Sequence, residues 1–128
     1  MKVYKNAWFV RFARKESISA EMLWEAVERA GKGQIDADLG GGVIKQRIAR
    51  VGGGKSAGYR SIVLFRTGEQ AYFVYGFSKS ELENIRKDEV AQFKKMAKHM
   101  FALTHEQLAL LIENGQIEEV TGNGKEIS

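Results

Sequence analysis

Hydrophobic side chains follow two different periods along this chain, and the first third follows the helical one. Residues 7–15 place a tryptophan and two phenylalanines at a spacing that lets them share one face of a helix. A second helix is predicted over about residues 20–30, where apolar residues recur every three or four positions and Ser17 or Ser19 can cap the first turn. The glycines that follow are expected to end this helix.

The hydrophobic period changes to two in the middle of the chain. Residues 43–50 alternate, with two isoleucines facing one way and Lys45 and Arg47 facing the other. Two further segments, 59–66 and 71–77, are rich in aromatic and β-branched residues, and a connection of hairpin length joins them. The centre of the chain therefore predicts a three-stranded antiparallel meander.

Helical spacing returns in the last third of the chain. Ser78 and Glu81 have the S-x-x-E spacing of a capping box, which predicts the start of a helix whose apolar stripe runs to Met100. Thr104 and Gln107 repeat the capping pattern and predict one more helix.

The order of these elements predicts an α+β fold. We expect a small antiparallel β-sheet, made of the three-stranded central meander and an N-terminal edge strand over residues 2–5. Two N-terminal helices and the C-terminal helices would pack on this sheet. A chain of 128 residues suits one domain spanning 1–128, with about 122–128 as a frayed polar tail.

Composition excludes several classes of protein. Apolar residues make up 44% of the chain, which is enough for a core and too many for a disordered chain. The chain has no cysteine and only two histidines, so we expect neither disulfides nor a bound metal or cofactor. No apolar run approaches the roughly 20 residues of a membrane span, and the first residues lack the apolar core of a signal peptide. The expectation is a soluble cytoplasmic protein that does not contact a membrane.

The distribution of charge is more informative than the net charge of +4. Residues 39–68 contain six basic residues and no acidic residue, whereas acids gather in the first helical segment and near the C-terminus. A patch of one sign attracts polyanions such as nucleic acids. The alternative is a solvated charged face without a ligand. The six basic residues are Lys45, Arg47, Arg50, Lys55, Arg60 and Arg66.

A hairpin over residues 43–60 would bring four of these cations into one neighbourhood. Its first strand is basic, a glycine-rich loop follows, and the next strand begins with another arginine. Such a cluster suits phosphates, because it neutralises backbone charge and arginine can bind two phosphate oxygens at once. Tyr59 and Tyr75 lie close in the pattern and are candidates for stacking on a base. The four cations are Lys45, Arg47, Lys55 and Arg60.

These segments resemble a known family. Residues 52–60, GGGKSAGYR, resemble the G-x-G-K-x-x-G-x-R stretch of RelE/HigB-like toxins of type II toxin–antitoxin systems, in the RelE/ParE superfamily. Residues 44–47 resemble the preceding basic strand of those toxins, and residues 75–81 resemble their final strand, which leads into a Lys-x-Glu segment. The order of elements also agrees over roughly residues 1–85.

The resemblance implies a ribosome-dependent mRNA endonuclease that inhibits translation. Such a toxin acts without metal, and the 2′-hydroxyl of the RNA attacks the adjacent phosphate. One side chain must accept that proton, another must protonate the leaving oxygen, and cations must hold the charge of the transition state. The implied partners are the ribosome, mRNA and a cognate antitoxin, which we expect to contain a helix-turn-helix domain and to be encoded beside the toxin.

Roles for individual residues follow from the resemblance. Lys45 and Lys55 are candidates for the base or acid, Arg47 and Arg60 are candidate phosphate clamps, and Lys79 is a further catalytic candidate. The candidate catalytic residues are thus Lys45, Lys55, Arg60 and Lys79, and the candidate RNA- or phosphate-binding residues are Arg47, Arg50, Tyr59 and Tyr75.

The chain departs from the family pattern at two places. Ser80 stands where some members carry a further arginine, and no tyrosine follows Tyr75, although some members use a C-terminal tyrosine. Two other interpretations stay open. A ParE-like toxin would inhibit DNA gyrase through protein contact without cleaving RNA, and a non-catalytic nucleic-acid-binding module would only hold phosphates.

Overall fold

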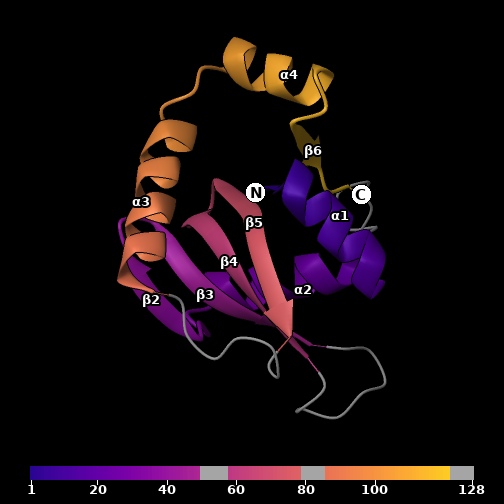
Figure 1. The fold of residues 1–128 in the computed structure, drawn as a ribbon, viewed down its shortest axis with the longest axis vertical. Coiled ribbons are helices and arrows are strands. Elements are labelled where there is room, and N and C mark those ends of the chain that lie inside the picture. Colours follow the sequence, from indigo (N-terminus) through magenta and orange to yellow (C-terminus); the bar gives the residue numbers. More distant parts are fainter. Residues whose placement is uncertain (50–57, 79–85, 122–128) are drawn as a thin grey trace.

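A mixed sheet of six strands organises the described part of the chain, in the order β2-β3-β4-β5-β1-β6 (Figure 1). The structure is a computed structural model and describes residues 1–49, 58–78 and 86–121. The strands are β1 (Lys2–Asn6), β2 (Ala37–Gly40), β3 (Val43–Ile48), β4 (Tyr59–Arg66), β5 (Gln70–Ser78) and β6 (Ile117–Glu119). The helices are α1 (Ala7–Glu16), α2 (Ala20–Gly31), α3 (Lys87–Phe101) and α4 (His105–Glu113).

The α+β class predicted from the sequence is confirmed, but the sheet differs from the predicted one. It is mixed rather than antiparallel, because β1 pairs with β5 in parallel. The N-terminal strand is also not at an edge, since β1 lies between β5 and β6. The two edges of the sheet are the short strands β2 and β6.

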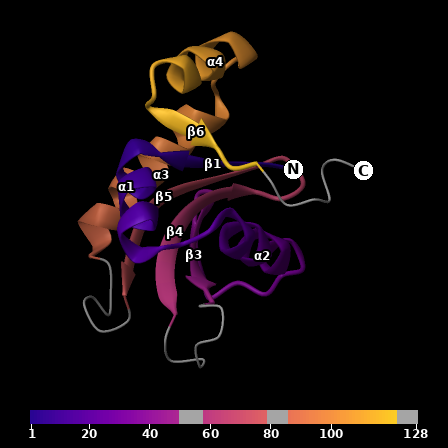
Figure 2. The ribbon, with the colours of Figure 1, turned by 90° about the vertical axis from the view of Figure 1, so that its right-hand side faces the viewer.

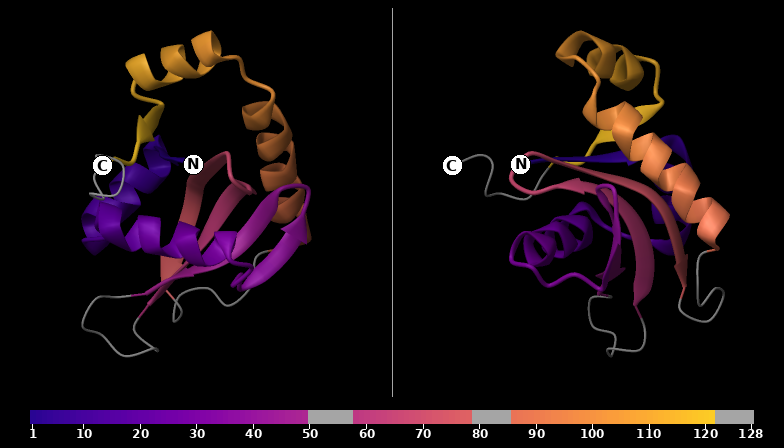
Figure 3. Two further views of the ribbon diagram at one scale, coloured as in Figure 1. Left: turned by 180° about the vertical axis from the view of Figure 1, so that it is seen from behind. Right: turned by 90° about the vertical axis from the view of Figure 1, so that its left-hand side faces the viewer.

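Each face of the sheet carries its own apolar cluster. The helices α1 and α2 cover one face, and α3 covers the other, so that α2 and α3 lie on opposite sides of the strands (Figures 2 and 3). The face covered by α1 and α2 buries Phe9, Leu23, Ile48, Val63 and Phe73. The face covered by α3 buries Ile62, Leu64, Tyr72, Ala97 and Met100.

Side-chain caps explain where three of the helices begin. The Asn6 side chain accepts a hydrogen bond from the backbone of Phe9 at 2.8 Å at the start of α1, and Ser19 caps α2. The predicted capping box of Thr104 with Gln107 is present at the start of α4. The helix that carries the apolar stripe to Met100 is α3, which begins at Lys87 rather than directly after Ser78, and the capping role of Ser78 itself stays a prediction. Its expected partner, Glu81, lies outside the described residues.

The C-terminal helices differ in how they meet the sheet. The helix α3 packs across β3 and β4, whereas α4 projects beyond the strands and packs against β6 (Figure 1). Leu110 of α4 is consequently 56% exposed. Within the described ranges, no helix is both long and apolar enough to cross a lipid bilayer.

Tyr72 gives a test of the packing beneath α3. Its side chain is fully buried, stacks on Tyr4 with ring centroids 4.9 Å apart, and has a hydroxyl without a hydrogen-bond partner among the described residues. Burial, followed by the neighbouring Tyr4, raises the pKa of Tyr72 to about 12. Above pH 10 the unfolded chain would lose this proton while the folded protein retains it, so stability should fall by about 2–3 kcal/mol between pH 10 and 12.

The substitution Tyr72→Phe should therefore make the alkaline loss of stability shallower, and should raise the free energy of unfolding at pH 7 by about 1 kcal/mol because an unpaired buried hydroxyl disappears. Urea denaturation at a series of pH values measures both effects. Tyr75→Phe, at a partly exposed tyrosine of the same strand, is the control. If the stability of Tyr72→Phe fell with pH as steeply as that of the parent protein, the raised pKa of Tyr72 would not be the cause of the alkaline loss.

Candidate functional site

The pairing of β3 with β4 places three cations on the sheet face that α3 covers in part. Arg47 lies directly opposite Arg60, and Lys45 lies opposite Ile62 in the next row. Because side chains alternate along a strand, all four point to the same side of the sheet. Lys45, Arg47 and Arg60 are each partly exposed. We call these three residues the cationic row.

Arg60 is held in place by a carboxylate from outside the hairpin. Its Nε lies 2.9 Å from Oδ2 of Asp36, and the two side chains are 21% and 31% exposed. The ion pair fixes one edge of the guanidinium and leaves its other N–H groups to bind a phosphate. Asp36 is not predicted as a site residue by the sequence, because no local pattern indicates that the residue before β2 reaches a side chain on β4, two strands away in the sheet.

The backbone of Arg47 is anchored to α2. The guanidinium of Arg29, on α2, donates a hydrogen bond to the carbonyl of Arg47 at 2.6 Å. The Nε of Arg47 is buried and has no hydrogen-bond partner within the described ranges. A Cβ added at Gly58 would lie 3.4 Å from this Nε and 2.7 Å from the carbonyl oxygen of Ile48, so the absence of a side chain at Gly58 allows the close approach.

Gln46 fixes the strand that carries the cationic row. It is 1% exposed and points to the opposite face, where its side-chain amide donates to the carbonyls of Ala26 and Gln34 at 2.9 and 3.0 Å. Its side-chain oxygen accepts from the backbone N–H of Asp36 at 3.2 Å. One buried amide on β3 thus links that strand to α2 and to the segment that precedes β2. The same amide holds the backbone of Asp36, which pairs with Arg60.

The two candidate tyrosines lie on different sides of the sheet. Tyr75 is opposite Ile62 on the face of the cationic row, since one extra residue in β5 shifts the register at this point. Tyr59 packs in the cluster under α1 and α2, is 7% exposed, and donates from its hydroxyl to the carbonyl of Glu16. The structure therefore does not bring Tyr59 to the surface that would bind a base.

An exposed aromatic side chain extends the surface beside Tyr75. The ring of Trp8, at the start of α1, lies 4.6 Å from the ring of Tyr75 between centroids and is 37% exposed. Phe93 of α3 approaches Tyr75 from another direction, with 6.0 Å between the centroids. The sequence pattern places Trp8 on the apolar face of a helix, and its exposure makes it a further candidate for stacking on a base.

Three candidate residues, Arg50, Lys55 and Lys79, lie outside the described residues. The strand residues nearest to them, Ile48, Tyr59 and Ser78, meet at one end of β3, β4 and β5, because Tyr59 pairs with Ile48 on one side and with Ser78 on the other. Arg60 and Arg47 are the next pair along β4 and β3. Arg47 and Arg60 therefore lie one residue from this end of the strands, and Lys45 lies three residues from it.

The fold and this surface together describe an α+β protein that carries a row of cations at one end of a mixed sheet. The sequence model of the family described as the RelE toxin of the RelE/RelB toxin-antitoxin system matches residues 1–120. The chain belongs to this family of toxins, as the resemblance predicted. Toxins of the family are generally endoribonucleases, and the family implies a cognate antitoxin as partner. A search of the curated proteins found no match.

The role of Gln46 can be tested by Gln46→Leu, which keeps the size of the side chain and removes its amide. The substitution leaves two carbonyls and one N–H without their partner, so we expect a loss of about 2–4 kcal/mol in the free energy of unfolding. Urea denaturation measures this loss. Gln92→Leu, at an exposed position of α3, is the matched control and should stay within about 0.5 kcal/mol of the parent protein. Equal effects of the two substitutions would contradict a special role for the buried amide.

Proposed function

We propose that this toxin is a ribosome-dependent mRNA endonuclease that inhibits translation and cleaves without a metal ion. The observation that carries the proposal is the direct opposition of Arg47 and Arg60 on one sheet face. Two guanidinium groups in one row provide the planar donors that bind phosphate oxygens and stabilise the charge of a phosphoryl-transfer transition state. Family membership supports the choice of RNA as the substrate.

The chemistry that we assign to this surface is an attack by the RNA's own 2′-hydroxyl. The oxygen forms a bond to the adjacent phosphorus, and the bond from phosphorus to the 5′-oxygen breaks, which leaves a 2′,3′-cyclic phosphate and a 5′-hydroxyl. Arg47 and Arg60 would hold the non-bridging oxygens, with Asp36 positioning Arg60. Lys45, Lys55 and Lys79 are the proposed proton carriers, and Arg50 would bind a flanking phosphate.

Recognition of the base is assigned to Tyr75, on the face of the cationic row, and to the exposed Trp8 of α1 that contacts it. Tyr75 and Trp8 present rings beside the cationic row, and stacking on such rings tolerates any base because every base has a π-face. The buried Tyr59 receives no role. The proposed partners are mRNA on the ribosome and a cognate helix-turn-helix antitoxin encoded beside the toxin, and the proposed location is the cytoplasm.

Expression in bacteria, with and without the gene beside it, tests the proposal. We expect growth arrest, mRNA cut within translated regions, and relief of the arrest by the neighbouring gene product. Arrest with intact mRNA and altered DNA supercoiling would instead indicate a gyrase inhibitor of the ParE kind. Absence of arrest would indicate a module that only binds nucleic acid.

Cleavage of mRNA on programmed ribosomes by the purified protein tests the cationic row. Arg47→Gln and Arg60→Gln should each lower the rate of cleavage on programmed ribosomes by about 10²–10³-fold, because each removes a charged donor to the transition state. Arg11→Gln, at an exposed arginine of α1, is matched in charge and should leave the rate unchanged. Full activity in both Arg47→Gln and Arg60→Gln would refute the proposal that these arginines hold the scissile phosphate.

Substrate chemistry tests the nucleophile independently of the protein. An mRNA with a 2′-deoxy sugar on the 5′ side of the scissile phosphate should bind and remain uncut, because the attacking oxygen is missing. A phosphorothioate at the scissile position should slow cleavage without rescue by Cd²⁺, since no metal would contact that oxygen. Cleavage of the deoxy substrate, or rescue by Cd²⁺, would rule out this mechanism.

A further inference from the structure

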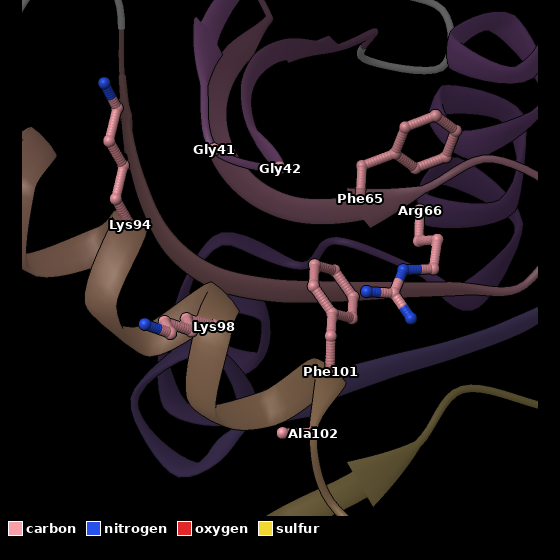
Figure 4. A pocket seen from close by; sticks show the side chains of 8 residues that line it. All are labelled: Gly41, Gly42, Phe65, Arg66, Lys94, Lys98, Phe101 and Ala102. Carbon is pink, nitrogen blue, oxygen red and sulfur yellow. The ribbon is translucent and has the colours of Figure 1, made fainter.

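A pocket lies between α3, the turn that joins β2 to β3, and the last residues of β4 (Figure 4). Its volume is about 520 Å³, which falls in the range of ligand-binding pockets. The residues that matter for its chemistry are Gly41, Gly42, Arg66, Lys94, Lys98 and Phe101. None of them belongs to the cationic row or to the aromatic pair of Tyr75 and Trp8.

The glycine turn keeps one wall of the pocket free of side chains. Gly41 and Gly42 have φ angles of +62° and +82°, which favour glycine. A Cβ at Gly41 would lie 3.1 Å from Cγ of Lys94, and a Cβ at Gly42 would lie 3.1 Å from Cε2 of Phe101. The turn therefore lies directly against α3, and a side chain at either glycine would crowd a residue that lines the pocket.

Three cations surround this pocket. Arg66, Lys94 and Lys98 are exposed, and no carboxylate of the described residues forms an ion pair with any of them. The guanidinium of Arg66 lies over the ring of Phe101, with its central carbon 4.6 Å from the ring centroid (Figure 4). The pocket thus combines a positive rim, without ion pairs among the described residues, with a guanidinium stacked on an aromatic ring.

We propose that this pocket binds a nucleotide, with its phosphate between Lys94 and Lys98 and its base against the guanidinium of Arg66 that lies over Phe101. The two lysines supply positive charge for the phosphate, and the planar guanidinium of Arg66, held over the Phe101 ring, offers a stacking surface for a base of any identity. The ligand is either one nucleotide of an RNA chain or a free nucleotide, because both carry the same two groups. The site does not depend on the proposed cleavage reaction.

The position of the pocket separates it from the cationic row. Arg60 and Arg66 stand at opposite ends of β4, six residues apart on the same face, which corresponds to about 20 Å along the strand. Between them, Ile62 and Leu64 are buried under α3. A single phosphate cannot reach both sets of cations, so the pocket is a second anion site rather than part of the cleavage site.

Two probes in an NMR titration of the whole protein test the proposal: adenosine 5′-monophosphate, and a short 2′-O-methyl RNA that cannot be cleaved. At constant ionic strength, at least one probe should shift the backbone amides of Gly41, Gly42 and Ala102. Shifts with the monophosphate identify a free nucleotide as sufficient, and shifts with the RNA alone identify a chain. The same shifts should persist in Arg47→Gln/Arg60→Gln, which separates this site from the proposed cleavage site.

Charge-matched variants then distinguish binding in the pocket from nonspecific attraction to the positive charge of the protein. Lys94→Gln/Lys98→Gln should weaken the binding of the active probe by about tenfold or more, because two charged contacts are lost. Lys32→Gln/Lys95→Gln removes the same charge from exposed positions outside the pocket and should change affinity by less than about twofold. Ala102→Tyr, which fills the exposed end of the pocket without changing charge, should also abolish the shifts.

Several results would overturn the proposal. These are the absence of shifts with both probes, an equal loss of affinity in the two lysine double variants, or undiminished binding in Ala102→Tyr. A polyglutamate peptide that produces the shifts while neither nucleotide probe does would assign the pocket to an acidic protein segment instead.

Discussion

The candidate site depends on one register: β3 pairs with β4 so that Arg47 faces Arg60 across the strands. Like charges directly opposite each other destabilise a sheet, so this arrangement costs free energy in the isolated protein. The nearby carboxylate of Asp36 offsets part of that cost by pairing with Arg60. The repulsion that remains would be relieved by a phosphate, which is the physical reason that such a pair favours an anionic ligand.

The supporting contacts lie on the other face of the same strand. Because side chains alternate, Gln46 sits between Lys45 and Arg47 in sequence but points into the layer between the sheet and α2. The Gln46 side chain makes three hydrogen bonds, and the hydroxyl of Ser61 donates to the backbone carbonyl of Gln46. These bonds fix β3 against α2, β4 and the segment before β2. A buried polar network of this kind holds reactive side chains in place more firmly than a loop can.

Local patterns in the sequence predicted the helices and the alternation of β3, because caps and hydrophobic periods are set by nearby residues. They could not predict the place of β1, whose parallel partner β5 is more than sixty residues away in the chain. Asp36 was missed for the same reason, since its contact with Arg60 crosses an intervening strand. The bulge in β5 also breaks the alternation from which the facing of each side chain is predicted, because it turns both Val74 and Tyr75 toward the face covered by α3.

The helix α3 divides the sheet face that it covers into two separate cationic surfaces. Its apolar residues, among them Ala97 and Met100, bury Ile62 and Leu64 in the middle of β4, which leaves Arg60 at one end of the strand and Arg66 at the other. Two of its lysines, Lys94 and Lys98, lie beside the second surface. Each surface can therefore bind an anion without exposing the core beneath α3, so occupation of one requires no movement of the helix that shapes the other.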